Sequence, residues 1–169
     1  MPSFMGSEMK NFKPDKLVQQ RRSDWLRLGG KLVTRIVEDS DKGISQDPDG
    51  RAFGKYSTDY RILKKAGKAT PKGVSSSRQV SPPNLRASGE MLNSIKAQKA
   101  TTDSVEIVYR SGLKVLGNAN PPAKTNKPRR NVYGLNNKNW DFAGDFISDE
   151  IDQRILKFNL KKVFFDIKV

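Results

Sequence analysis

The chain has 169 residues, of which 35% are hydrophobic and 30% are charged, and it contains neither cysteine nor histidine. Without these residues it has no disulfide bridge, no thiolate zinc site and no mechanism built on a cysteine nucleophile or an imidazole base. The formal net charge of +14 predicts attraction to polyanions or to acidic protein surfaces. The length indicates one domain, and we expect no catalytic site, no cofactor, no bound metal and no membrane association.

Residues 1–14 contain two prolines and a glycine without hydrophobic periodicity, so we expect an extended N-terminal arm. Asp15 is a candidate N-cap for a long helix over residues 15–39, where apolar residues recur at three- and four-residue steps. This stripe consists of Leu17, Val18, Trp25, Leu28, Leu32, Val33 and Ile36. Gly29 and Gly30 each cost about 1 kcal/mol relative to alanine. They mark a kink, a close approach of another backbone, or a tolerated weak point.

The next helix is predicted over residues 59–66, after a loop rich in Asp, Gly, Ser and Pro. Ser57 or Thr58 is its expected cap, with Tyr60 and Leu63 as apolar anchors. Residues 67–84 contain prolines, glycines, serines and several basic residues, which predicts a flexible basic loop. The acidic residues before residue 54 do not fit a calcium-binding loop and are better explained by turn formation.

A further helix is expected after Ser88, its predicted cap, with Met91, Leu92 and Ile95 as apolar members. Residues 105–109 then alternate between apolar and polar side chains, which predicts a strand. A turn at residues 111–112 is expected to lead into a second strand at residues 113–116.

The last predicted helix covers residues 139–157. Its apolar stripe consists of Trp140, Phe142 or Ala143, Phe146 or Ile147, Ile151 and Ile155. Residues 158–169 have β-forming composition and are interpreted as a C-terminal docking arm or an edge strand. The predicted fold is therefore α+β, in which a long N-terminal helix and a C-terminal helix pack on a small antiparallel sheet. Long polar loops and extended terminal arms complete it, with residues 15–157 as the single domain.

Three short phrases give the most specific information about function. They are Asp-Gly-Arg-Ala-Phe-Gly-Lys-Tyr-Ser at residues 49–57, Leu-Arg-Ala-Ser-Gly-Glu-Met-Leu-Asn-Ser-Ile at residues 85–95, and Arg-Asn-Val-Tyr-Gly-Leu at residues 130–135. Their order and spacing resemble those of the tail-completion, or virion-morphogenesis, family of tailed bacteriophages. The fold-defining motif positions are Phe53, Tyr56, Ser88, Gly89 and Gly134.

The resemblance implies a structural virion protein that forms a homo-oligomeric ring, expected to be hexameric, in the neck of the phage. Such a ring completes the tail and joins it to the head connector. The implied partners are the connector or adaptor and the tail-tube or tail-terminator proteins, with packaged DNA as a non-specific partner. Assembly would occur in the cytoplasm of the bacterial host, and the final location would be the virion.

Two sets of residues are candidates for contacts in such a particle. The first consists of apolar residues near the C-terminus that are candidates for a subunit interface: Val163, Phe164, Phe165, Ile167 and Val169. The second consists of basic residues that would face the DNA channel or an acidic partner: Lys124, Lys127, Arg129 and Arg130. Two other function classes stay open, a non-specific nucleic-acid-binding protein and, with less support, a carboxylate-dependent enzyme.

Overall fold

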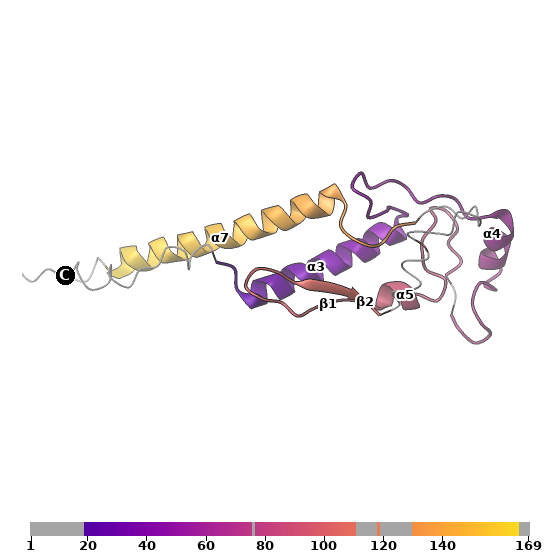
Figure 1. Ribbon diagram of the computed structural model, residues 1–169, viewed down its shortest axis with the longest axis horizontal. Helices are drawn as coiled ribbons and strands as arrows, with labels where there is room; N and C mark the ends of the chain where they lie inside the picture. Colours follow the sequence, from indigo (N-terminus) through magenta and orange to yellow (C-terminus); the bar gives the residue numbers. More distant parts are fainter. Residues whose placement is uncertain (1–18, 76, 111–117, 119–129, 166–169) are drawn as a thin grey trace, which may run out of the picture.

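The computed structural model describes residues 19–75, 77–110, 118 and 130–165. It contains the helices α3 (Arg22–Asp41), α4 (Thr58–Lys65), α5 (Glu90–Asn93) and α7 (Asn137–Phe165), together with the strands β1 (Ile95–Gln98) and β2 (Glu106–Tyr109). The two long helices and a two-stranded antiparallel sheet pack together (Figure 1). The predicted α+β class is thus confirmed.

Helix α3 carries most of the core, as its apolar stripe predicts. Leu28, Leu32 and Ile36 are all buried along one face. The helix begins at Arg22, later than expected, because Asp24 accepts a hydrogen bond from the backbone N–H of Arg21 at 3.0 Å and so caps the first turn. The predicted cap Asp15 and the N-terminal arm lie outside the described residues.

The two central glycines of α3 have different roles. A Cβ on Gly29 would lie 2.8 Å from both Ala97 Cβ and Val105 Cγ2, so the missing side chain lets the helix approach the sheet closely. A Cβ on Gly30 would meet nothing within 4 Å. The close-approach interpretation therefore holds for Gly29, and the weak-point interpretation holds for Gly30.

The sheet pairs β1 with β2 in antiparallel register, with Ile95 opposite Tyr109 and Ala97 opposite Ile107. The prediction that Ile95 belongs to a helix is wrong, because α5 ends at Asn93 and Ile95 begins β1. The strand at residues 105–109 is correct to within one residue. Its expected partner at residues 113–116 lies outside the described residues.

Two adjoining clusters form the core. The first contains buried residues from α3, α5, β1 and the loops: Ile36, Phe53, Met91, Leu92, Ile95 and Val132. The second lies between α3 and α7, where Leu28, Leu32 and Ala143 are buried and Phe142, Phe146 and Ile147 pack around them. The predicted stripe left Phe142 or Ala143 and Phe146 or Ile147 as alternatives, and all four contribute to this cluster. Trp140 was also expected there, but 62% of its surface is exposed, so that prediction is wrong.

Helix α7 runs antiparallel to α3 and extends past the N-terminal end of α3 (Figure 1). Three polar contacts are consistent with this antiparallel direction. Asn139 contacts Arg35, Glu150 contacts Arg27, and Arg154 contacts Asp24. The helix continues to Phe165, so the expectation of an edge strand is wrong for residues 158–165. Adding residues to an existing helix is easier than starting a new element, which favours continuation of α7 beyond Lys157 over a change to extended backbone.

Candidate functional site

The three sequence phrases meet in one region of the fold. Phe53 from the first phrase packs in the same buried cluster as Met91 and Leu92 from the second and Val132 from the third. These residues are far apart in the sequence, and burial of each removes apolar surface from water, which stabilises the fold by about 1.5–3 kcal/mol per large side chain. We call this region the motif junction.

Arg130 joins the third phrase to the first. Its Nε donates to the carbonyl of Gly54 at 3.1 Å, and its Nη2 donates to the carbonyl of Lys55 at 2.9 Å. The guanidinium also lies 4.7 Å from the centre of the Tyr56 ring, a cation–π distance.

Arg130 is therefore not placed as the predicted DNA-channel residue. Only 9% of its surface is exposed, and its guanidinium is already engaged inside the chain. A basic residue in a loop was expected to be solvated, but the open carbonyls of residues 54 and 55 and the ring of Tyr56 bind it instead. The other three candidates, Lys124, Lys127 and Arg129, lie outside the described residues.

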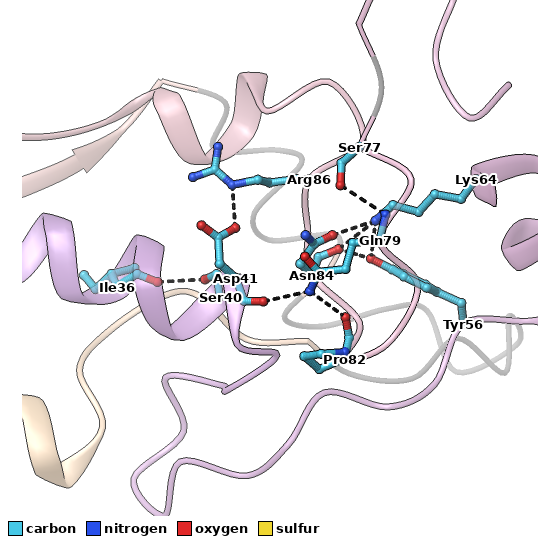
Figure 2. A network of polar contacts seen from close by, with 10 residues as sticks. All are labelled: Ile36, Ser40, Asp41, Tyr56, Lys64, Ser77, Gln79, Pro82, Asn84 and Arg86. Carbon is cyan, nitrogen blue, oxygen red and sulfur yellow. Dashed lines mark hydrogen bonds and ion pairs between the residues drawn. The ribbon is translucent and has the colours of Figure 1, made fainter. Parts of the chain in front are cut away.

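A buried lysine also contacts Tyr56, with Lys64 Nζ 4.7 Å from the centre of the ring (Figure 2). Lys64 has no exposed surface, and its Nζ donates to Asn84 Oδ1 at 2.7 Å, to the Asn84 carbonyl at 3.2 Å and to Tyr56 Oη at 3.0 Å. Tyr56 in turn donates its hydroxyl proton to the same Asn84 carbonyl. These oxygens are the acceptors that the N–H groups of a lysine ammonium require.

Burial changes the protonation equilibria in this cluster. Desolvation, followed by the nearby positive charge of Arg130, lowers the pKa of Lys64 from 10.5 to about 8. Desolvation raises the pKa of Tyr56 from 10.0 to about 12, and it also raises the pKa of Tyr60. Desolvation lowers the pKa of Arg130 as well.

A lysine with a lowered pKa beside a tyrosine is also a combination found in nucleophilic amine chemistry. Here the Lys64 side chain is enclosed on all sides, so a substrate carbonyl cannot reach Nζ without opening the fold. The arrangement instead fixes α4 to the segment around Asn84. We therefore interpret the cluster as a structural connection.

Sequence reasoning placed Leu63 as an anchor of α4, and that prediction is wrong. Leu63 is 45% exposed, whereas the neighbouring Lys64 is buried. Of the two predicted caps, Ser57 is confirmed, because its Oγ accepts from the backbone N–H of Tyr60 at 3.4 Å, and Thr58 is the first residue of the helix. No local signal marks Lys64 as buried, since its acceptors on Asn84 come from a segment 20 residues later.

The segment before the second phrase is tied to the rest of the fold. The Gln79 side chain donates to the carbonyls of Asp41 and Pro82, each at 3.1 Å, and Arg86 forms an ion pair with Asp41 at 2.5 Å (Figure 2). Asn84 itself is buried. Residues 79–84 of the predicted flexible loop therefore pack against the C-terminal end of α3.

Gly89 and Gly134 both have a positive φ, as expected of glycines at turns, but the N-cap of α5 lies one residue later than predicted. Gly89 has φ +81° and is the N-cap of α5, so Ser88 lies one position before the cap. Its hydroxyl still accepts from the backbone N–H of Glu90 at 3.4 Å. Gly134 has φ +95° just before α7, a backbone conformation that favours glycine.

A second polar network joins the start of α7 to α3. Asp39 Oδ2 accepts from three side-chain amides, those of Gln46 at 3.0 Å, Asn136 at 3.2 Å and Asn139 at 3.0 Å. Arg35 Nε donates to Asn139 Oδ1 at 2.7 Å. This network sets the position of α7 after the third phrase.

A shallow depression of about 500 Å³ lies beside this network. It is lined mainly by polar residues of the 45–52 loop, including Ser45, Asp47 and Asp49, and by Asn137. Within the described ranges, no group of three or more His, Cys, Asp or Glu side chains is arranged to hold a metal ion. Among those same residues, no helix combines the length and apolar composition needed to cross a membrane.

The candidate interface residues near the C-terminus fall into two groups. Val163, Phe164 and Phe165 belong to the last turns of α7. Ile167 and Val169 lie outside the described residues.

Comparisons with protein-family models, with curated proteins and with solved structures give no match to this chain.

Proposed function

We propose that this chain is a structural virion protein of a tailed phage, which forms an oligomeric ring in the neck, completes the tail and joins it to the head connector. The ring would bind the connector or adaptor on one face and a tail-tube or tail-terminator protein on the other. In this proposal the chain is not an enzyme, and its mechanism is assembly of identical subunits.

The observation that carries the proposal is the motif junction. The phrases that resemble the tail-completion family are separated by 27 and 34 residues in the sequence, yet Phe53, Met91 and Val132 share one buried cluster. Arg130 binds the backbone of the first phrase, and Gly134 makes the turn into α7. Each phrase thus has a fold-defining role, as expected of motifs that characterise a structural family.

The elongated shape of the molecule also supports a role as a ring subunit between head and tail. Helix α7 projects beyond α3 at one end, and α4 lies at the other end (Figure 1). Elongated subunits with contact surfaces at both ends can bind neighbours on either side, which is the requirement for a closed ring.

The experiment that tests this proposal deletes the gene from the phage that encodes it and then adds the purified protein back to the lysate. Without the protein, we expect DNA-filled heads and free tails that do not join, visible by electron microscopy. Addition of the purified chain to this lysate should restore infectious particles. Normal joined particles without the protein would contradict the proposal.

Non-specific nucleic-acid binding remains the alternative, and its support is the net charge of +14. Such binding should weaken steeply with salt and be independent of sequence. If lysates without the protein contain joined particles while the purified chain binds DNA in this way, the alternative is favoured.

A further inference from the structure

Helix α4 exposes aliphatic side chains to solvent, because Lys64, and not Leu63, is the residue that it buries. Lys64 and the half-buried Tyr60 attach the helix to the fold, while Ile62 is 62% exposed and Leu63 is 45% exposed. Arg61 and Lys65, which flank these aliphatic residues, are exposed, and neither forms an ion pair with another described residue. We call Arg61, Ile62, Leu63 and Lys65 the α4 surface.

Helix α7 presents the opposite charge. Asp141, Asp145, Asp149 and Asp152 follow one another at steps of four, four and three residues, so they line one face of the helix. All four are exposed, and none forms an ion pair with another described residue. We call these four residues the aspartate ridge.

An unpaired ridge of this kind is unfavourable in an isolated helix. Like charges at i, i+4 destabilise a helix by about 0.2–0.5 kcal/mol per pair, so a nearby basic surface would stabilise α7. Apolar side chains lie at both ends of the ridge, since Trp140 is 62% exposed and Leu156 is 53% exposed. Exposed tryptophan is among the residues that contribute most to protein–protein affinity.

The two surfaces complement each other in charge and in apolar character. The α4 surface combines two cations with two aliphatic side chains, and the ridge combines four carboxylates with exposed apolar residues at its ends. Within one chain, α4 lies at one end of the molecule, whereas the ridge lies on the part of α7 that runs along α3, away from α4 (Figure 1). A contact between them is therefore best made between two copies.

We propose that the aspartate ridge of one copy docks on the α4 surface of a neighbouring copy. Because the two surfaces differ, the contact is heterologous, and repetition of it gives a ring when the rotation between copies closes. This inference rests on the proposed ring, for which it names the subunit interface.

The test is a charge swap measured by light scattering over a range of protein concentrations. The ridge variant carries Asp145→Lys and Asp149→Lys, and the α4 variant carries Arg61→Glu and Lys65→Glu. Each variant alone places like charges opposite each other, so we expect the concentration needed for assembly to rise by at least about tenfold. The variant with all four changes should assemble close to the wild-type concentration.

The matched control reverses two exposed lysines that belong to neither surface, Lys72→Glu and Lys96→Glu. It changes the net charge as much as the α4 variant does, and it should assemble normally. Thermal melting of every variant separates loss of assembly from loss of folding.

The outcomes distinguish this inference from the proposed function. If the wild-type chain forms multimers and both reversal variants form them equally well, the interface is wrong while the ring proposal stands. If each reversal prevents assembly but the combined variant does not restore it, the ridge and the α4 surface bind something other than each other, such as residues 1–18 or another protein, and the inference is again wrong. If the wild-type chain stays monomeric at every concentration and also does not assemble on isolated heads or tails, both proposals fail.

Discussion

Lys64 is buried, and no carboxylate is among the described residues that accept hydrogen bonds from its Nζ. Its Nζ donates to both oxygens of Asn84 and to the hydroxyl of Tyr56, and the guanidinium of Arg130 lies 4.7 Å from the centre of the same Tyr56 ring. These oxygens satisfy the hydrogen bonds of an ammonium but do not neutralise its charge. Burial therefore favours the neutral amine, which lowers the pKa of Lys64 to about 8.

This shift predicts a specific dependence of stability on pH. Lys64 has a pKa of 10.5 when unfolded and about 8 when folded, so between these values the unfolded chain binds more protons. The free energy of unfolding should thus rise from about pH 8 toward pH 10, by on the order of 2 kcal/mol. Above pH 10 the trend should reverse, because the pKa of Tyr56 is raised to about 12 and the unfolded chain loses that proton first.

Denaturant unfolding at about pH 7.5 and pH 9.5 measures this effect. The wild type should be more stable at the higher pH, and Lys64→Met should lose most of the difference. Lys65→Met is the matched control, because Lys65 is the exposed neighbour on the same helix, and it should keep the difference. An equal rise in the Lys64→Met protein would show that another group causes it.

The two glycines of α3 give a second residue-scale prediction. Gly29→Ala should destabilise the fold by about 1–3 kcal/mol, because the new methyl group would lie 2.8 Å from Ala97 Cβ. Gly30→Ala should stabilise it by about 0.5–1 kcal/mol, since that position is open and alanine is the better helix former. Thermal unfolding of both variants checks the prediction, and two changes of the same sign would contradict the packing of α3 on β1.

Among single residues, the buried apolar side chains could be predicted from the sequence, whereas the buried basic side chains could not. Leu28, Leu32 and Ile36 could be assigned to the core from spacing alone, and they are buried. Lys64 and Arg130 could not, because a long basic side chain is normally solvated and their acceptors come from distant segments. The part of the motif junction that depends on these two residues was therefore not predictable from local pattern.

Among the elements, β1 shows why short strands escape prediction. It has four residues, and Ile95 follows α5 directly, so its apolar side chains also fit a continuing helix. Pairing with β2 and packing of Ala97 beneath Gly29 decide its conformation. These are tertiary contacts, which local pattern does not contain.

Helix α7 was predicted more successfully in its first half than in its second. Residues that pack on α3 show the helical spacing, and the structure buries Ala143 among them. Beyond Lys157 the composition is β-forming, but the helix continues to Phe165. Intrinsic strand preference is weak and depends on context, so an established helix can override it.

Removal of the end of α7 tests whether it serves the subunit or its neighbours. Among the side chains of α7 that the structure describes, Arg154 makes the last ion pair with α3, to Asp24, and it also donates to Gln20. Deletion of residues 158–169 should therefore leave the melting temperature of the isolated subunit nearly unchanged while it prevents assembly. Circular dichroism melting and light scattering give the two readouts, and a truncated chain that still builds complete necks would rule out the docking role.

For the molecule as a whole, the net charge of +14 is unevenly distributed. The aspartate ridge lies on the part of α7 that runs along α3, whereas the α4 surface carries two exposed cations at one end of an elongated subunit (Figure 1). Opposite charge on two different surfaces of one chain favours heterologous association of identical copies. The fold class could be predicted from the sequence, but this polarity could not, since it depends on which side of each helix faces the solvent.

The central claim is that the chain works as an oligomeric ring, and the most direct test is the mass of the purified protein in solution together with its appearance by electron microscopy. The account predicts one discrete multiple of the 19.0 kDa chain, seen as closed rings, either alone or on isolated tails and filled heads. A protein that remains a monomer at every concentration and does not assemble on heads or tails would contradict it.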